Sequence, residues 1–259
     1  MQTPQGPDAP ASTKPFVVPC RALPWHAPFG WLAAGWRDLC RAPGLSLAMG
    51  LLVVAVSAVV AALAWWLGRF ALLATLLSGF VFVAPLLAAA LYEVSRAIEH
   101  GRRPRMADCL ARARRVTGQA AVFALAQMVV LLVWSRAGMA VNAFVPIEDG
   151  TVHSLLEFIA VGSAIGAVFA TASFAASAFS LPMVADRDVD MVTGLVSSVN
   201  AVLRNKPACA VWALLIALLT AFGIATALLG LALVMPWLAY ATWHGYRAIL
   251  DTSDWPALD

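Results

Sequence analysis

The stretch at residues 207–246, PACAVWALLIALLTAFGIATALLGLALVMPWLAYATWHGY, decides the fold class, because it is almost wholly apolar and contains no Asp, Glu, Lys or Arg. As one helix it would be about 60 Å long at 1.5 Å per residue. The hydrocarbon core of a bilayer is only about 30 Å thick, so a single span would need an implausible tilt. We therefore expect a break near Phe222 and Gly223, with a membrane-spanning helix on each side.

The rest of the chain follows the same pattern. Apolar residues make up 62% of the 259 residues and charged residues only 12%, about half of the usual share of roughly 25%. This composition excludes a water-soluble protein. The sequence predicts an all-α fold, a bundle of six transmembrane helices, at residues 45–67, 70–92, 118–141, 155–183, 208–222 and 225–246. This transmembrane domain covers residues 29–250, between a flexible Pro-rich cytoplasmic tail at 1–28 and a short cytoplasmic tail at 251–259.

The positive charges predict the orientation of these spans. With six spans, 15 of the 17 Lys and Arg residues lie on one side, and only Arg69 and Arg136 lie on the other. Because Lys and Arg accumulate on the cytoplasmic side of membrane proteins, both termini are expected in the cytoplasm. All four cysteines fall on that reducing side, so no disulfide is expected.

The order of the segments predicts an internal repeat. Amphipathic stretches at 29–41, 105–116 and 190–203 each precede an outward span and suit helices that lie in the membrane interface. Pro85 and Pro236 are followed, at the same offsets, by Leu, Ala, Ala, Arg, Ala and Ile, and the stretch around Pro182 is a weaker match. We therefore expect three related helical hairpins, each preceded by a cytoplasmic interfacial helix.

A family resemblance falls on these same parts of the sequence. Its carriers are Gly35, Trp36, Asp38, Pro85, Tyr92, Ser95, Arg96, Glu99, Gly101, Trp134, Pro182, Met183, Asp186, Arg187, Asn200, Trp243, His244, Tyr246 and Arg247. With these residues the chain resembles an uncharacterised family of bacterial polytopic inner-membrane proteins, a domain of unknown function, over nearly its whole length after the N-terminal tail. Ala84 departs from the family's Gly. The resemblance implies a multi-pass protein of the bacterial inner membrane and no established activity.

Catalytic motifs are absent from the sequence. It contains no Walker phosphate loop, no H-E-x-x-H and no C-x-x-C-H. Ser163 lies near the outer part of its predicted span and His244 at the inner end of another, so they cannot act as nucleophile and base. We expect no catalytic residue, no cofactor, no metal and no nucleic-acid partner. The protein is expected not to be an enzyme, and an intramembrane enzyme has no motif to support it.

Polar residues at the inner ends of the second, fourth and sixth spans form the first candidate site. Arg96 and Arg247 both lie eleven residues after their prolines, and two like charges at equivalent places need an acid between them, for which Asp186 and Glu99 are available. The predicted polar vestibule comprises Tyr92, Arg96, Glu99, Asp186, Arg187, Trp243, His244 and Arg247. The alternative is that these residues are interface anchors and ordinary cytoplasmic positive charges.

Two further sets of charged residues are candidates. The loop between the second and third spans is rich in Arg and suits anionic lipid headgroups. This predicted lipid-headgroup face comprises Arg102, Arg103, Arg105, Arg112, Arg114 and Arg115; the alternative is that they are topology signals only. Near the outer leaflet, Arg136 and Glu157 are predicted to form an ion pair, with independent snorkelling to the interface as the alternative.

The sequence favours an interaction role over chemistry. We expect a non-enzymatic scaffold, assembly factor or accessory component that binds anionic membrane lipids, with a membrane-protein partner or a homodimer as further options. Gly162, Gly166 and Ala170 form a small-residue ridge that suits either such a dimer or close packing within one chain. The alternative function is a small-solute or ion transporter, suggested by proline-interrupted helices in internal repeats. Against it, the central parts of the six spans contain no ionisable residue.

Overall fold

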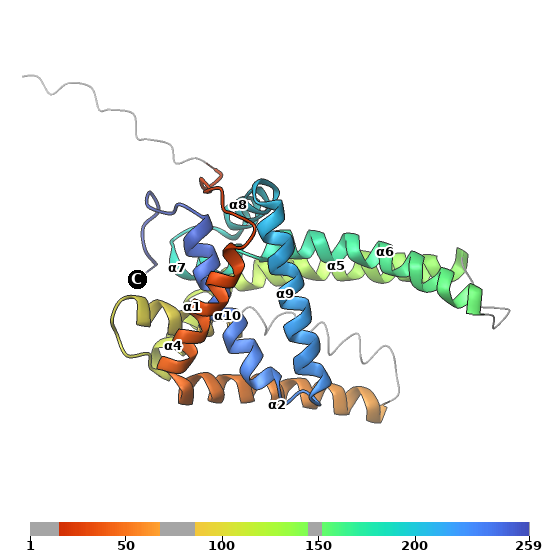
Figure 1. Cartoon of the computed structure of the whole chain (residues 1–259), viewed down its shortest axis with the longest axis horizontal. Coiled ribbons are helices and arrows are strands. Elements are labelled where there is room, and N and C mark those ends of the chain that lie inside the picture. Colours follow the sequence, from red (N-terminus) through yellow and green to blue (C-terminus); the bar gives the residue numbers. More distant parts are fainter. Residues whose placement is uncertain (1–15, 68–85, 145–151, 259) are drawn as a thin grey trace, which may run out of the picture.

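The computed structural model describes residues 16–67, 86–144 and 152–258 (Figure 1). These ranges fold into helices, so the predicted all-α class is confirmed. The outer part of the second predicted span, residues 1–15 of the tail and Asp259 lie outside the described residues. The helices are α1 (Ala27–Arg41), α2 (Pro43–Leu67), a helix at 86–99, α4 (Met106–Arg115), α5 (Thr117–Phe144), α6 (Val152–Ser177), α7 (Ser180–Asp186), α8 (Met191–Arg204), α9 (Lys206–Ala225) and α10 (Leu231–Ile249).

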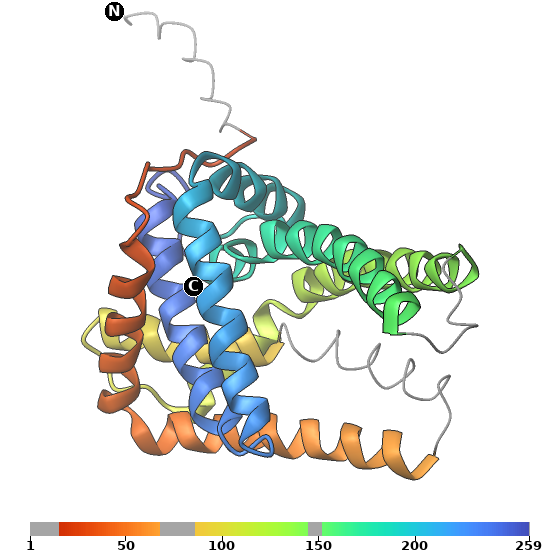
Figure 2. The ribbon, with the colours of Figure 1, turned by 45° about the vertical axis from the view of Figure 1, so that its right-hand side comes forward.

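Three stretches of the described chain are long and apolar enough to cross a membrane: Thr117–Ala140, Leu156–Asp186 and Lys206–Ala225. α1 and the first part of α2 add a fourth if they are taken as one span bent by 106°. In Figures 1 and 2, α9 and α10 run across the direction of α5 and α6. The described helices therefore do not form one parallel bundle. The reason is that α5 and α6 pack on each other and reach the rest of the chain mainly through α8, whereas α10 packs against α1, α2 and α9.

Two breaks between helices fall within the predicted spans 155–183 and 225–246. The last apolar stretch is divided as predicted, but the break falls at 226–230, after Phe222 and Gly223, which lie within α9. There Ala227 and Leu228 have positive φ angles of 53° and 70°. The chain also turns between α6 and α7, three residues before Pro182. There the Ser198 hydroxyl accepts a hydrogen bond from the Phe179 N–H at 3.1 Å and donates one to the Ala175 carbonyl at 2.7 Å. These bonds satisfy backbone groups that the break would otherwise leave without partners.

Three short helices, α1, α4 and α8, each lead after a single junction residue into a long helix, α2, α5 or α9. In each case the carbonyl of the junction residue accepts the backbone N–H four residues further on. These bonds measure 3.0, 2.7 and 2.9 Å for Ala42–Ser46, Val116–Ala120 and Asn205–Cys209. The three junctions thus share one hydrogen-bond pattern.

The core lies where α1 packs along α10. Trp31 of α1 contacts Phe179 and Trp212 edge to face, with ring centroids 6.2 and 5.7 Å apart. The two helices approach closely because Gly35 has no side chain: a Cβ there would lie 2.6 Å from the backbone nitrogen of Ala241. Close approach of this kind brings the ends of several helices together on one side of the molecule.

Both flanking segments fold back onto this side. Val18 is fully buried and its N–H donates to the Ser197 hydroxyl at 3.0 Å, and Cys20 forms an isolated β-bridge with Leu250. Trp255 is also buried. Within the two segments predicted to be tails, Val18, Thr252 and Trp255 are therefore buried. The Pro-rich composition hid this, because a segment without regular structure can still bury single side chains in a preformed groove.

Candidate functional site

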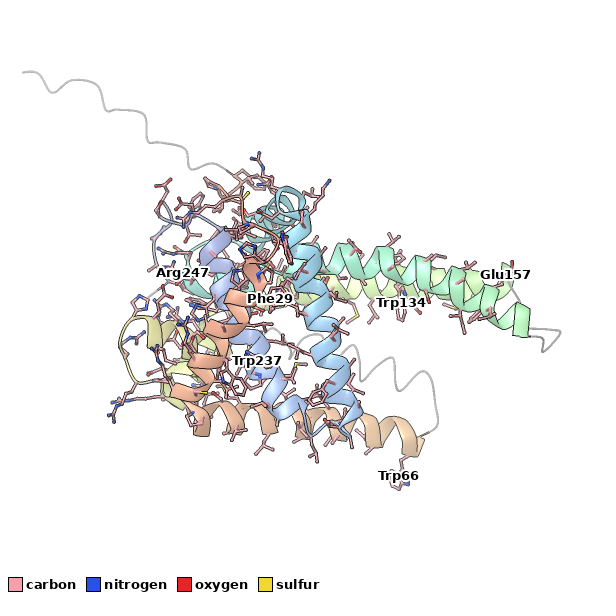
Figure 3. The ribbon with its side chains drawn as sticks, viewed as in Figure 1. Phe29, Trp66, Trp134, Glu157, Trp237 and Arg247 are labelled. Atoms are coloured by element: carbon pink, nitrogen blue, oxygen red, sulfur yellow. The ribbon has the colours of Figure 1, made fainter. Side chains whose placement is uncertain are left out.

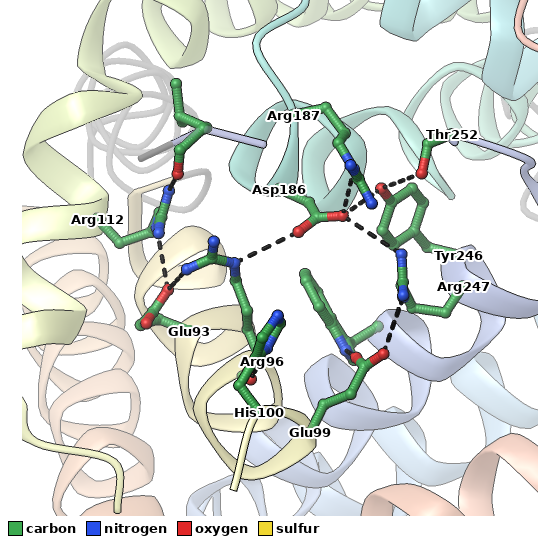
Figure 4. A network of polar contacts seen from close by, with 12 residues as sticks. Glu93, Arg96, Glu99, His100, Arg112, Asp186, Arg187, Tyr246, Arg247 and Thr252 are labelled. Atoms are coloured by element: carbon green, nitrogen blue, oxygen red, sulfur yellow. Dashed lines mark hydrogen bonds and ion pairs between the residues drawn. The ribbon is translucent and has the colours of Figure 1, made fainter. Parts of the chain in front are cut away.

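Asp186, at the end of α7, is the centre of a polar cluster at this side of the molecule (Figure 4). Its carboxylate is 4% exposed. The Tyr246 hydroxyl donates to Oδ2 at 2.7 Å, and the Arg187 Nε lies 3.0 Å from the same oxygen. The guanidinium groups of Arg96 and Arg247 approach from opposite sides, at 3.4 Å from Oδ1 and 3.6 Å from Oδ2. One carboxylate thus separates the two arginines that occupy equivalent places in the predicted repeat.

Glu99 extends this network toward solvent. Its Oε1 lies 3.0 Å from Arg247 Nη2, and its Oε2 accepts a hydrogen bond from the Trp243 indole N–H at 2.9 Å. For Arg247, burial lowers the pKa, but the carboxylates of Glu99 and Asp186 outweigh it and raise the pKa above its ordinary value. Arg247 therefore stays charged and ties α10 to both acids.

Glu93 is the centre of a second group of ion pairs, and the sequence analysis did not single it out. Its carboxylate is 3% exposed and lies 3.5, 3.4 and 3.0 Å from Arg96, Arg102 and Arg112. Arg112 also donates from Nη1 to the Leu258 carbonyl. One signal could have found Glu93, since it lies three residues before Arg96 and so on the same helix face.

Two predicted vestibule residues lie apart from the Asp186 network. His244 bonds instead to Asp38 of α1, with 2.7 Å between Nε2 and Oδ2. Tyr92 is buried and lines a largely apolar pocket of about 270 Å³ with Val53 and Leu238. The structure brings together Arg96, Glu99, Asp186, Arg187, Trp243 and Arg247, and it adds Tyr246. A functional role for this cluster stays a prediction.

The predicted lipid-headgroup face is only partly exposed. Arg102, Arg103, Arg105, Arg114 and Arg115 are exposed, but the side chain of Arg112 is only 8% exposed. Placing Arg112 on this face was therefore wrong, because that side of α4 packs on the helix at 86–99, where Glu93 pairs with it. Burial, with Arg96 nearby, lowers the pKa of Arg112, although Glu93 opposes this. Burial and the nearby acids Glu93 and Asp108 raise the pKa of the neighbouring Cys109 thiol to about 12.

Arg136 and Glu157 do not form the predicted ion pair. Both side chains are exposed, and no ion pair joins them in the described residues. Trp134 faces α6, where it lines a pocket of about 340 Å³ with Gly166 and Ala170 (Figure 3 shows Trp134 and Glu157). Arg136 lies two residues further on, about 200° around the helix, so it points away from α6. Two members of the small-residue ridge thus face α5 of the same chain.

Two polar pairs recur at equivalent places in the predicted repeat. Asp38 and Arg112 each lie four residues before the junction residue of their short helix. Their partners His244 and Glu93 each lie eight residues after the proline of a returning helix. In both cases a short helix is tied to the returning helix of another unit.

The described residues contain no group of three or more His, Cys, Asp or Glu side chains that could hold a metal ion. The four cysteines are free thiols. Acids of the cluster bond to arginines and to Tyr or Trp groups. The arrangement can therefore hold charges and helix ends in place, and it shows no activated nucleophile.

The exposed surface defines the class of protein. Large apolar side chains along α5, such as Leu125, Val129 and Leu132, are 59, 61 and 59% exposed. With the candidate spans, this surface identifies a multi-pass α-helical integral membrane protein.

Comparison with known families agrees with this class. Residues 72–186 match a family of unknown function described as "Predicted integral membrane protein (DUF2189)". This match bears out the predicted resemblance over that range, from before Pro85 to Asp186; resemblance at Gly35 or Trp243, outside it, stays a prediction. No curated protein and no solved structure matches the chain.

Proposed function

We propose that this chain is a non-enzymatic scaffold, assembly factor or accessory component of the bacterial inner membrane that binds anionic lipid headgroups on a basic cytoplasmic face. The observation that carries the proposal is the outer surface of α4. There Met106 and Leu110, 40 and 51% exposed, lie on one side of a short helix that also carries the exposed Arg114. An apolar strip next to arginine is typical of helices at a membrane interface.

The arginines around this strip are available to lipids. Arg103, Arg105 and Arg114 are exposed, and no acid pairs with them in the described part of the chain. Each such charge near an anionic surface contributes about 1 kcal/mol of attraction, which salt weakens. We define these three residues as the lipid face.

A six-span threading with both termini in the cytoplasm is part of the proposal. It is supported by the placement of 15 of 17 basic residues and by the common hydrogen-bond pattern of the three helix junctions. The same pattern supports three related helical units. A periplasmic reporter fused at Gly101 should be silent, and one fused at Gly150 should be active; the reverse result would contradict the threading.

A non-enzymatic role agrees with the chemistry of the polar cluster. Arg96, Arg187 and Tyr246 donate hydrogen bonds to the Asp186 carboxylate, and Arg247 forms an ion pair with it at 3.6 Å. Both oxygens of this carboxylate are engaged by these neighbours, which favours a structural role over proton transfer. The cluster is therefore suited to holding three helix ends together and presenting a fixed surface to a membrane-protein partner.

One observation favours the transporter as a second candidate. The turn at Ala178 and Phe179 makes the α6–α7 span discontinuous, as in carriers whose broken helices form substrate sites. Ser198 already bonds to the backbone at this break, which leaves fewer groups for a solute. Uptake of solute by reconstituted vesicles, lost on Ser198→Ala, would favour transport over a scaffold.

The lipid proposal is tested by replacing Arg103, Arg105 and Arg114 together with Gln. Native mass spectrometry of the purified protein should show less bound anionic phospholipid than for the unmodified chain, because three headgroup charges lose their partners. Arg136→Gln, which removes an exposed arginine from α5 at the opposite face, is the control and should retain it. An unchanged lipid profile in the triple variant would overturn the lipid face.

A further inference from the structure

A pocket of about 360 Å³ lies between the end of the 86–99 helix and α4, on a different side of α4 from the lipid face. The charged residues that line it are Glu93, Arg96, Arg102, Asp108, Arg112 and Arg115. Four guanidinium groups thus share the pocket with two carboxylates.

The arginines retain unused hydrogen-bond donors. Each guanidinium carries five N–H groups, and Arg96, Arg102 and Arg112 share the carboxylate of Glu93. Outside it, Arg96 has only Asp186 and Arg112 only the Leu258 carbonyl as a further acceptor among the described residues. Two of the contacts with Glu93, at 3.4 and 3.5 Å, are long for charge-assisted hydrogen bonds. The pocket therefore has an excess of two positive charges and several donors without a close acceptor.

Burial makes this excess more costly. The side chains of Arg96 and Arg112 are only 10 and 8% exposed, so water screens their mutual repulsion poorly. The lowered pKa of Arg112 has this origin, with burial first and Arg96 second. An anion bound between these two groups would offset the repulsion.

The Asp186 side of the same cluster offers no such opening. There the rings of Trp243 and Tyr246 occupy the space beside the carboxylates, and both donate hydrogen bonds to them. Among the pockets found in the described residues, those at Tyr92 and at Trp134 have mainly apolar linings. The excess of guanidinium groups thus distinguishes the pocket beside α4 from those two pockets.

The pocket faces away from the apolar strip that Met106 and Leu110 form on α4. Asp108, Arg112 and Arg115 are spaced by four and three residues, so they share one face of α4. Met106 and Leu110 each lie two residues before a member of that face, about 200° around the helix. With Met106 and Leu110 at the membrane, the pocket opens toward the aqueous side.

We propose that this pocket binds a phosphate group, as inorganic phosphate or as the phosphomonoester of a soluble compound or lipid headgroup. A phosphomonoester carries a charge of about −1.5 to −2 near pH 7 and three acceptor oxygens, which matches the excess charge of the lining. Planar guanidinium groups bind such oxygens in pairs. Arg102 and Arg115, both exposed at the rim, contact the ligand together with Arg96 at the base.

The test uses the full chain in detergent and titrates inorganic phosphate against chloride at equal ionic strength. Arg102→Gln with Arg115→Gln removes two rim arginines, and Arg103→Gln with Arg114→Gln is a control with the same loss of charge outside the pocket. Phosphate affinity should fall about tenfold for each arginine lost from the pocket. It should stay within about twofold in the control pair, whose charges are exposed and screened.

Asp108→Asn provides an independent check that does not weaken the pocket. Removing this carboxylate from the lining leaves the arginines in place and raises the positive charge, so phosphate should bind more tightly. Equal losses in the two double variants, no binding above that in chloride, or weaker binding by Asp108→Asn would each overturn the phosphate site.

Vesicles of phosphatidylcholine with phosphatidic acid as the minor component then identify the source of the phosphate. If the pocket variant loses vesicle binding and free phosphate competes, the ligand is a lipid headgroup. If only the Arg103 and Arg114 variant loses vesicle binding while the pocket variant loses phosphate, the ligand is soluble and the lipid face stands separately. If the Arg103 and Arg114 variant loses vesicle binding and the unmodified chain binds no phosphate, the phosphate pocket is overturned and the lipid face stands.

Discussion

The polar end of the molecule, which holds the Asp186 and Glu93 networks, and the α5–α6 hairpin differ in what surrounds their side chains. At the polar end, charged side chains from four parts of the chain are buried against one another, with Asp186 4% and Glu93 3% exposed. Along α5 and α6, most side chains are apolar and few are buried, and the hairpin projects away from the rest (Figure 1). The comparison shows that polar and apolar environments do not follow the order of the segments along the chain. What separates them is whether the surroundings are other helix ends or the membrane.

The largest expected effect is at Asp186. Replacing it with Ala leaves Arg96, Arg187 and Arg247 close together without their shared carboxylate, and losing one partner of a buried ion pair costs about 3 to 5 kcal/mol. Thermal unfolding in detergent should show a clear loss of stability. Glu157→Ala, which removes an exposed acid from α6, should change stability by no more than about 0.5 kcal/mol. Equal effects of the two changes would remove the distinction between the regions.

Glycines give a second contrast between the two regions. At Gly35 an added methyl group would meet the backbone of Ala241, so Gly35→Ala should destabilise the α1–α10 contact by about 1 to 3 kcal/mol. At Gly162 on α6 an added Cβ has nothing within 4 Å. Gly162→Ala should therefore be neutral or slightly stabilising, since Ala favours a helix. Denaturation of both variants in the same detergent checks this, and a costly Gly162→Ala would point to a partner on that face.

A double-mutant cycle measures the coupling energy between Arg96 and Asp186 at the polar end. Arg96→Ala and Asp186→Ala each leave an unmatched charge, whereas the double variant removes both, so its cost should be less than the sum. The expected coupling between these contacting residues is about 0.5 to 3 kcal/mol. The free energies of unfolding of the four proteins measure it. Additive costs would mean that the two residues act as separate interface anchors.

The smallest effect is expected at the start of α8. The side chain of Asp190 accepts the Thr193 backbone N–H at 2.9 Å, and this bond lowers the pKa of Asp190. Because the folded-state pKa is the lower one, the cap stabilises the protein above the unfolded-state pKa, and this is lost as pH falls through the folded-state value. Asp190→Ala should cost about 1 kcal/mol at neutral pH. Unfolding measured from neutral to acidic pH should show the difference from the unmodified chain shrinking.

Sequence reasoning found one part of the candidate site and missed another for a physical reason. Arg96 and Arg247 could be placed together because both follow a proline at the same offset, and like charges there need an acid such as Asp186. Arg112 was placed on the surface because arginine-rich loops usually are exposed. Its burial depends on α4 packing over Glu93, a contact that no local pattern encodes. No local pattern encodes the partner of His244 either, because Asp38 is 206 residues away along the chain.

The sequence by itself determined what each segment requires from its surroundings. Long uncharged stretches require a membrane or a protein interior, and this requirement was readable from length and hydropathy alone. Only the tertiary structure decided which charges neutralise one another, that Val18 and Trp255 are buried, and that α9 and α10 run across α5 and α6. These features depend on contacts between distant parts of the chain, and their free energy comes from the removal of specific groups from water, which no single segment can specify.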